Sequence, residues 1–515
     1  MTRGTTSLAY AYDLVGNVTQ RTLPDGTIVA YAYNNDGLLS TVTAGSDTTS
    51  YSYDPAGNLT ATSLPNAVSE TRAYDRSGRV TAIQGTAGAT TVSSHNYTRD
   101  PVGNPSTVTT PNGSVNYLYD AKDHLTRACW NADCDSATEF IAFSYDPVGN
   151  RLSKTAQLPG VLSEPAGTTT YAYDVDDRLT AATGPLGPTS YDYDANGSQT
   201  TAGAWNYSYD QANRMASASN TLTTVTYSYD GDGNRLVADA GALPGDETRY
   251  QWDPNNPLPL LVEERDGNNT QTREHLHGTE QISMETAGAR SYYLHDHLGS
   301  TLALTSPSGA TQRTYDYLPF GQLRNTTQPD PLAPENLTRF TGQLFDAQTG
   351  LYHLRARQYD PTTGRFTATD PVPPQIDDPY VASYIYANNN PTRFIDPSGL
   401  SFRDWVRRNA NTIKTTTTVV AAGGCIVLSF GACAAAAGVG FIVRTGTNLA
   451  SGGCVGTIAQ DALVTSLTLG VGKVLDTGLK GLQLARSGQS ASRSNLQAPV
   501  ASANIYDTYN SSSCK

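Results

Sequence analysis

The stretch Tyr51-Ser52-Tyr53-Asp54-Pro55-Ala56-Gly57-Asn58 decides the fold, because it is one copy of a pattern that recurs along the chain. In the first four copies the second tyrosine lies at positions 12, 33, 53 and 74, at spacings of 21, 20 and 21 residues. Later copies of the Tyr-Asp step begin at Tyr119, Tyr145, Tyr173, Tyr193, Tyr209 and Tyr229. A fixed period of this kind indicates a repeat architecture.

Each copy predicts a strand, a turn and a returning strand. The two tyrosines of Tyr-x-Tyr-Asp share one face of a strand, because side chains alternate along it. The aspartate is expected to accept hydrogen bonds from turn amides, and Gly-Asn supplies the positive-φ turn. A single hairpin cannot bury its own face, so the copies must stack. We therefore expect a mainly β fold, a spiralling antiparallel sheet that forms a partial shell; an unspecific all-β domain is the alternative.

Composition agrees with many short strands and argues against one class of partner. The 515 residues include 46 Gly, 31 Tyr and 28 Pro, whereas charged residues make up only 16%. Such a chain exceeds one ordinary core, so at least two structural units are expected. The net charge is −13, and the last 115 residues carry ten basic and four acidic residues, which leaves −19 for residues 1–400. The negative net charge of residues 1–400 would repel a phosphate backbone, so no nucleic-acid partner is expected for this part of the chain.

The cysteines and the N-terminus give weaker signals. Cys129 and Cys134 are close enough for a small disulfide loop, although two free thiols fit equally well. No four-ligand zinc spacing is present. No charged n-region followed by an apolar stretch opens the chain, so no signal peptide is visible. We expect either a fragment or a protein exported without an N-terminal signal.

The repeat resembles a known family. Tyr-Asp-x-x-Gly-Asn at a spacing of about 20 residues is similar to the YD repeat of Rhs proteins, insecticidal toxin complex C components and teneurins. Denser motifs follow and resemble the Rhs core-associated domain: Tyr292–Ser300, Tyr315–Gly321, Gly350–Pro361 and Asp396–Leu400. The resemblance implies a hollow β-cage, divided into repeats (1–285), a core-associated domain (286–400) and a variable tail (401–515). Residues 1–285 are short for such a cage, so closure by this chain alone is not expected.

The run His295-Asp296-His297 raises the question of a metal site. Alternate residues of a strand project together, so the two histidines might share a face. No third ligand is identifiable, and the run falls in a motif of the resembling family. The structural interpretation is favoured, and neither a metal nor a cofactor is expected.

Two carboxylates carry the chemical hypothesis. Two aspartates held close together share one proton, so that one can activate water while the other polarises a carbonyl. The resemblance implies that Asp370 and Asp396, each followed by proline, form this pair and cut the bond between Leu400 and Ser401. It leaves two further assignments open: Arg365 is expected to orient a carboxylate, and Asp360 is the rival for the upstream role. Ordinary Asp-Pro turns are the alternative interpretation.

The tail after residue 400 is expected to be small and mainly α. Residues 401–414 are basic, and residues 415–443 carry no charge over a length that could span a bilayer. A membrane-inserting helical hairpin and a buried Ala-rich helix pair remain alternatives. The tail contains no His and no Glu, which argues against histidine-dependent nucleases and zinc proteases. It is interpreted as a toxin or pre-toxin whose activity the sequence does not identify.

Together these features predict a carrier that encloses its own tail and releases it by aspartyl autoproteolysis, in interbacterial competition or toxin delivery. Expected partners are the tail as cargo, a cognate immunity protein, a secretion-system or shell-completing partner, and a membrane contacted by residues 415–443. The expected location is secreted or at the cell surface. The alternatives are a carbohydrate-binding surface or wall protein without an active toxin, and a remnant that neither cuts nor poisons.

Overall fold

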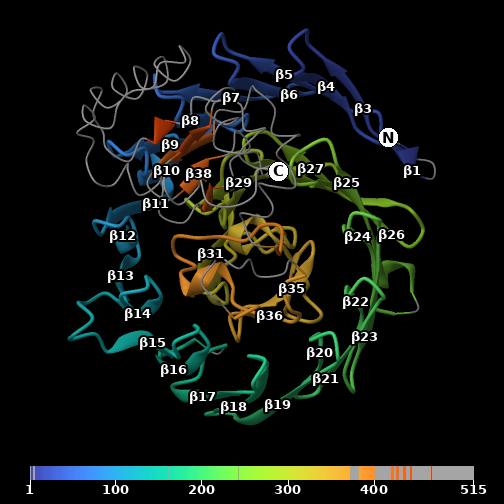
Figure 1. Ribbon diagram of the computed structural model, residues 1–515. Helices are drawn as coiled ribbons and strands as arrows, with labels where there is room; N and C mark the ends of the chain where they lie inside the picture. Colours follow the sequence, from blue (N-terminus) through green and yellow to red (C-terminus); the bar gives the residue numbers. More distant parts are fainter. Residues whose placement is uncertain are drawn as a thin grey trace, which may run out of the picture.

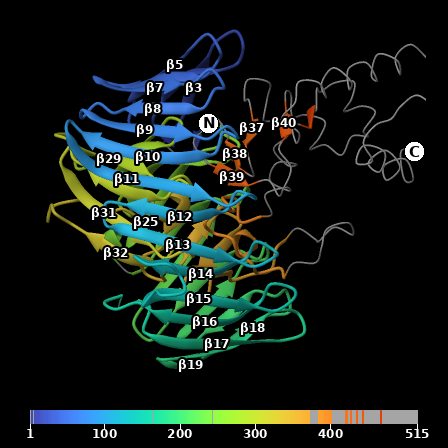
Figure 2. The same cartoon turned by 90° about the vertical axis from the view of Figure 1, so that its left-hand side faces the viewer.

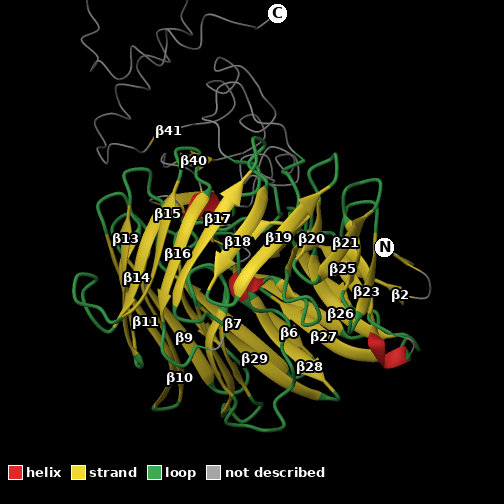
Figure 3. Cartoon of the chain, turned by 90° about the horizontal axis from the view of Figure 1, so that it is seen from below, coloured by secondary structure: helices red, strands yellow, loops and turns green. Residues whose placement is uncertain are grey.

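The computed structural model describes residues 2–400, apart from 4–5, 162, 242 and 372–381, together with five short strands beyond residue 400. Almost all regular structure is strand (Figure 3). Strands β3 to β32 form one antiparallel sheet in which each strand pairs with the next along the chain. Figure 1 shows this sheet curving around the molecule into a shell. The predicted spiralling antiparallel shell is therefore confirmed.

The first half of this sheet comprises β3 (Ala9–Tyr12), β4 (Val18–Thr22), β5 (Ile28–Tyr33), β6 (Leu39–Ala44), β7 (Asp47–Tyr53), β8 (Leu59–Ser63), β9 (Val68–Tyr74), β10 (Val80–Ala87), β11 (Thr90–Arg99), β12 (Pro105–Thr110), β13 (Gly113–Tyr119), β14 (Leu125–Trp130), β15 (Glu139–Tyr145), β16 (Arg151–Gln157) and β17 (Gly167–Tyr173). The second half comprises β18 (Leu179–Gly184), β19 (Gly187–Tyr193), β20 (Gln199–Ala202), β21 (Trp205–Tyr209), β22 (Met215–Ser219), β23 (Thr224–Tyr229), β24 (Arg235–Asp239), β25 (Glu247–Asp253), β26 (Leu260–Asp266), β27 (Gln271–His277), β28 (Gln281–Thr286), β29 (Ala289–His295), β30 (Thr301–Thr305), β31 (Thr311–Tyr317) and β32 (Leu323–Thr327). A separate pair, β1 (Thr2–Arg3) and β2 (Thr6–Ser7), precedes it, and the 3-10 turn η1 (Pro244–Asp246) lies before β25.

The repeat chemistry is the one that the sequence predicts. In the copy at 51–58, Asp54 Oδ1 accepts hydrogen bonds from the backbone N–H groups of Ala56 and Asn58, both at 2.9 Å. Gly57 takes a φ of +84°, which glycine adopts without steric cost. The Tyr53 hydroxyl donates to the Leu39 carbonyl at 2.8 Å. The second tyrosine thus ties each copy to the preceding one.

The same tyrosine bond recurs along the sheet. It joins Tyr33 to Val18, Tyr74 to Leu59, Tyr119 to Pro105, Tyr145 to Leu125, Tyr173 to Arg151 and Tyr229 to Met215. The row satisfies the polar ends of buried rings, which would otherwise cost free energy inside the shell.

The late strands of the sheet return against the early ones (Figures 1 and 2). Arg21 of β4 forms a buried ion pair with Asp253 of β25 at 3.0 Å. The Asn66 side chain donates to Thr305 Oγ1 at 3.0 Å. A shared apolar core fills the space between the layers, with Leu23, Val29, Val42 and Val68 from one side and Val262, Leu276, Ile282 and Leu294 from the other. The sheet therefore buries one face against itself.

The described residues 333–371 and 382–400 are called the interior segment below and lie inside this ring (Figure 1). The segment contains η2 (Phe340–Gly342), β33 (Leu344–Phe345), β34 (Tyr352–Leu354), β35 (Arg357–Asp360), β36 (Arg365–Phe366) and η3 (Ala387–Asn389), and β33 to β36 form a small antiparallel sheet. Tyr352, Tyr359, Tyr386 and Phe366 form its buried aromatic core. The repeat sheet itself runs unbroken through residue 285 to Thr327, so the expected boundary at 285 remains a division of sequence motifs.

The described part of the tail differs from the expectation. It consists of β37 (Val419–Ala422), β38 (Cys425–Val427), β39 (Cys433–Ala435), β40 (Phe441–Val443) and β41 (Thr465–Ser466), paired in the order β39-β38-β37-β40-β41. The helices expected for 415–443 are therefore not found at these residues, where β-branched and aromatic residues such as Val419 and Phe441 favour strands. Among the described residues, no helix is long and apolar enough to cross a membrane. The expected basic helix at 401–414 lies outside the described residues.

Among the residues that the structure describes, one disulfide is present. Cys129 and Cys134 are bonded, with their Cα atoms 5.3 Å apart, across the connection from β14 to β15. The Cys129 side chain is fully buried. The disulfide alternative of the sequence analysis is therefore the one found.

Candidate active site

The interior segment brings Asp370 and Asp396 to the same side chain. Asp370 follows β36, and its backbone N–H donates to the Ser383 carbonyl at 3.2 Å. Asp396 follows η3, close to the end of the segment. Nη2 of Arg357, the first residue of β35, lies 3.1 Å from Asp370 Oδ2 and 3.4 Å from Asp396 Oδ2. The two predicted carboxylates therefore meet at one guanidinium.

Burial of Arg357 and Asp396 shifts the pKa values of both side chains. Arg357 and Asp396 are 5% and 7% exposed. Burial raises the pKa of Asp396 to about 7; Arg357 opposes this rise and the negative charge of Asp370 adds to it. Burial also lowers the pKa of Arg357 from its ordinary value. A carboxyl group whose pKa lies near neutral pH, with a second aspartate on the same arginine, has the properties that general acid–base catalysis needs.

The backbone carbonyls before the expected cut each accept a hydrogen bond from residues 355–357, which connect β34 to β35. Arg355 Nη1 donates to the Pro397 carbonyl. The Ala356 N–H donates to the Ser398 carbonyl at 3.1 Å. Arg357 Nε donates to the Gly399 carbonyl at 2.6 Å. Three successive residues thus donate hydrogen bonds to three successive carbonyls, the last of which directly precedes Leu400.

Leu400 and Gly399 complete this arrangement. The Leu400 N–H donates to Asp396 Oδ1 at 3.0 Å. Gly399 has a φ of +65°, and a Cβ there would collide with the Leu354 carbonyl. Glycine is therefore required for the close approach. Ser401, the other side of the expected cut, lies outside the described residues.

The structure gives Arg365 a different partner from the expected one. Its Nη1 donates to Asn150 Oδ1 at 3.0 Å, and its Nη2 donates to the Asp177 carbonyl at 2.7 Å. Arg357 occupies the place beside the carboxylates that the sequence analysis assigned to Arg365. The sequence motif contained Arg355, Arg357 and Arg365 within eleven residues, and only tertiary contacts separate their roles.

Asp360, the rival for the upstream role, is a turn residue. Its Oδ1 accepts from the Thr362 N–H at 2.8 Å, and its Oδ2 accepts from Thr363 Oγ1 at 2.9 Å. These are the bonds of an ordinary Asx turn. The geometry favours Asp370.

The segment that carries Asp396 is docked on the ends of shell repeats. Asn390 Nδ2 donates to Asn104 Oδ1 at 2.9 Å and to the Asp123 carbonyl at 2.8 Å. Asn389 Nδ2 donates to the Gly149 carbonyl at 2.7 Å. Repeat turns therefore fix the segment that leads to Asp396, which the sequence analysis did not foresee.

The histidines of the 295–297 run have protein partners. His295 Nδ1 lies 3.3 Å from Glu280 Oε2, and His297 Nε2 lies 3.1 Å from the Thr392 carbonyl. Burial lowers the pKa of His297 well below its ordinary value. Within the described part of the chain, no group of three or more His, Cys, Asp or Glu side chains is arranged to hold a metal ion.

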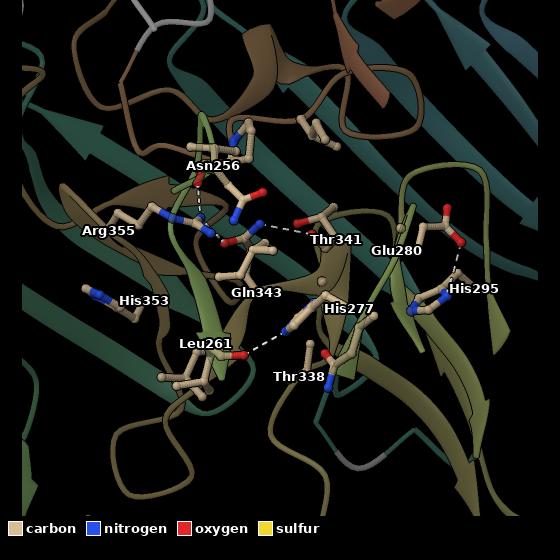
Figure 4. A pocket seen from close by; sticks show the side chains of 18 of the residues that line it. Asn256, Leu261, His277, Glu280, His295, Thr338, Thr341, Gln343, His353 and Arg355 are labelled. Atoms are coloured by element: carbon tan, nitrogen blue, oxygen red, sulfur yellow. Dashed lines mark hydrogen bonds and ion pairs between the residues drawn. The ribbon is translucent and has the colours of Figure 1, made fainter. Parts of the chain in front are cut away.

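A cavity of about 150 Å³ lies beside the Asp396 loop (Figure 4). Ile395 and Pro397 contribute to its wall, together with Leu261, His277 and other residues of β25 to β29. Arg355 also lines the cavity. Its Nη1 donates both to the Pro397 carbonyl of the Asp396 loop and, at 3.0 Å, to Oε1 of Gln343 in the cavity wall. Neither Asp370 nor Asp396 lines this cavity. The carboxyl pair is therefore separate from it.

A sheet of stacked Tyr-Asp hairpins wrapped around an interior segment defines a YD-repeat shell protein. The chain belongs to the Teneurin YD-shell family, whose model matches residues 2–128 and 67–392. The similarity covers nearly the whole described shell and interior segment.

Individual relatives are more distant. The tRNA3(Ser)-specific nuclease WapA of Bacillus spizizenii is 27% identical over 311 residues, which are 59% of this chain and 11% of the nuclease. The salivary gland surface protein 1 of Aedes aegypti is 44% identical over 110 residues, 21% of this chain and 3% of that protein. The chain thus spans only about a tenth of the WapA nuclease.

Solved structures agree on the fold. The crystal structure of TcdB2-TccC3-Cdc42 matches with a TM-score of 0.64 at 20% identity, over 77% of this chain and 22% of that chain. The structure of TcdB2-TccC3 without its hypervariable C-terminal region matches equally well, with a TM-score of 0.64. Both share the shell.

Proposed function

We propose that this protein is a YD-repeat carrier that encloses its C-terminal region and cuts itself between Leu400 and Ser401. The observation that carries the proposal is the meeting of Asp370 and Asp396 at Arg357, beside a Leu400 whose N–H is bonded to Asp396. A buried carboxyl group with a raised pKa, a second carboxylate on the same arginine and a peptide segment held by hydrogen bonds fit an aspartyl protease that acts on its own chain.

Water is the attacking group, and the two carboxyl groups are the base and the acid of the reaction. Asp370, beside the Arg357 cation, takes a proton from water as its oxygen adds to the Leu400 carbonyl carbon. The protonated Asp396 supplies a proton to the carbonyl oxygen, which gives a neutral gem-diol. On collapse, the Asp370 proton passes to the Ser401 nitrogen and a gem-diol proton returns to Asp396. The products are a Leu400 carboxyl group and a free Ser401 amine.

The released part would be residues 401–515 as an effector, with the shell as its container. The WapA relatives are named as tRNA nucleases and the structural neighbours contain TccC3, so delivery of a toxin in interbacterial competition or against another target fits the family. A cognate immunity protein and a shell-completing or secretion partner belong to this proposal. The Cys129–Cys134 disulfide supports a secreted or surface location, because disulfides persist in oxidising compartments.

The intact mass of the purified chain tests the proposal. The wild-type protein is expected as two pieces ending at Leu400 and beginning at Ser401, whereas Asp370→Asn and Asp396→Asn remain whole. Asp360→Asn is the matched control, because the amide keeps the turn acceptor, and it is expected to cut normally. A wild-type chain that stays whole contradicts autoproteolysis, and cutting by either dyad variant contradicts the assignment.

A further inference from the structure

Ser398 stands between Asp396 and the carbonyl that the proposed reaction attacks. Its Oγ lies 3.1 Å from the Leu400 carbonyl oxygen, to which it donates, and 3.2 Å from Asp396 Oδ1. The Leu400 N–H also approaches the same Oγ at 3.1 Å. Ser398 is 4% exposed, so these contacts exclude bulk water.

Among the described contacts, Asp396 makes no direct hydrogen bond to the Leu400 carbonyl oxygen. Its Oδ1 accepts from the Leu400 N–H and its Oδ2 faces Arg357, while among the described residues Ser398 is the one side-chain donor on the Leu400 oxygen. A hydroxyl has one proton to donate and two lone pairs that accept. Ser398 can therefore accept a proton from Asp396 while it donates its own to Leu400.

We propose that Ser398 is a catalytic residue that relays a proton from Asp396 to the Leu400 carbonyl oxygen. The inference rests on the proposed autoproteolysis and assigns one further group to it. As water adds to the Leu400 carbon, the Asp396 proton moves to Ser398 Oγ and the original hydroxyl proton moves to the Leu400 oxygen. Ser398 ends neutral, Asp396 ends ionised, and the proton lost by water resides on Asp370, so charge and atoms balance.

The turn 355–357 makes the relay rigid. The Ser398 carbonyl is fixed by the Ala356 N–H, and the flanking carbonyls of Pro397 and Gly399 are held by Arg355 and Arg357. Removing one preorganised donor from a developing oxyanion typically slows a reaction by about 100-fold or more. A loss of that order is therefore expected on removing the Ser398 hydroxyl.

The rate of cutting of the newly made chain tests this role. Full-length wild type, Ser398→Ala and Ser398→Thr are made by cell-free translation, and the uncut fraction is followed during a chase. Ser398→Ala is expected to cut about 100-fold more slowly, and Ser398→Thr, which keeps the hydroxyl, is expected to recover most of the rate. Ser300→Ala is the control: this buried serine accepts from the Thr341 N–H at 3.0 Å, away from Leu400.

The outcomes separate the two claims. A wild-type chain that never cuts overturns the proposed function itself. A wild type that cuts, with Ser398→Ala cutting at the same rate, overturns the relay and leaves the dyad in place. Equal slowing in Ser398→Ala and Ser300→Ala, with equally lowered melting temperatures, also overturns the relay, because it reports a general loosening of the segment.

Discussion

Arg365 donates a 3.0 Å hydrogen bond to Asn150, a residue 215 positions earlier in the chain. The bond joins the interior segment to the end of a shell repeat. The same turn is contacted by Asn389, a few residues before Asp396. The candidate site is thus a product of the whole shell, and the predictions below separate its chemistry from its support.

Replacing Arg357 by glutamine is expected to abolish cutting while the shell still folds. The change removes the only cation that the structure places on both Asp370 and Asp396 among the described residues, together with the hydrogen bond to the Gly399 carbonyl. The uncut fraction after purification is the measurement. Arg178→Gln, at a half-buried arginine of the shell paired with Asp174, is the control and should leave cutting unchanged. Normal cutting by Arg357→Gln would contradict its role.

The rate of cutting is expected to fall as the pH rises above about 7. Burial raises the pKa of Asp396 from the ordinary 3.8 to about 7, so the proton that the reaction needs is retained below that pH and lost above it. An unshifted aspartate would have lost this proton near pH 4. Chase experiments across a pH series measure the effect. A rate that is constant from pH 6 to 9 would contradict the assignment of Asp396 as the acid.

Gly149→Ala is expected to weaken the docking of the interior segment. Gly149 has a φ of +95°, and a Cβ there would lie 2.8 Å from Ile385 Cδ1 and 3.2 Å from Asn389 Nδ2. Gly16 has a similar φ of +91° with open space around it, so Gly16→Ala isolates the backbone cost. That cost is about 1–2 kcal/mol, and the clash at Gly149 adds about 1–3 kcal/mol. Melting temperatures that fall equally in both variants would contradict the contact.

Asp346→Asn is expected to be strongly destabilising. Asp346 Oδ2 accepts from Arg235 Nη1 at 2.9 Å and from the Tyr227 hydroxyl at 2.8 Å, and Arg235 is 1% exposed. The amide leaves a buried cation without its anion, at a cost of about 3–5 kcal/mol. Glu139→Gln breaks the half-exposed pair with Arg324 and should cost about 0–1 kcal/mol. Denaturant midpoints that shift equally for both would contradict this ranking.

The repeat sheet could be predicted from the sequence because its determinants are local. Tyr53, Asp54 and Gly57 each act within one hairpin or on its neighbour, so the pattern carries the geometry. The proximity of Asp370 and Asp396 followed from the family resemblance, and their catalytic role stays a prediction.

The other contacts of the site could not be predicted in the same way. The role of Arg357 rather than Arg365 depends on which guanidinium faces Asp396 after the segment has packed, and nothing in their spacing encodes this. The docking of Asn390 on Asn104 joins residues 286 positions apart. The helix prediction for 415–443 is wrong at the residues described as strands. Periodicity does not separate the two structures there, because short apolar runs that contain Val and Ile fit either one.

The contacts of Asn390 with Asn104 and of Asn389 with Gly149 also have a consequence in time. During synthesis the turns at 104 and 149 leave the ribosome more than two hundred residues ahead of Asp396. The turns that bind Asn389 and Asn390 are therefore synthesised first. Asp370 and Asp396 would then come together on a shell that has already been made. On the proposed function, the order of translation itself would delay cleavage after Leu400 until the shell that encloses the tail is present.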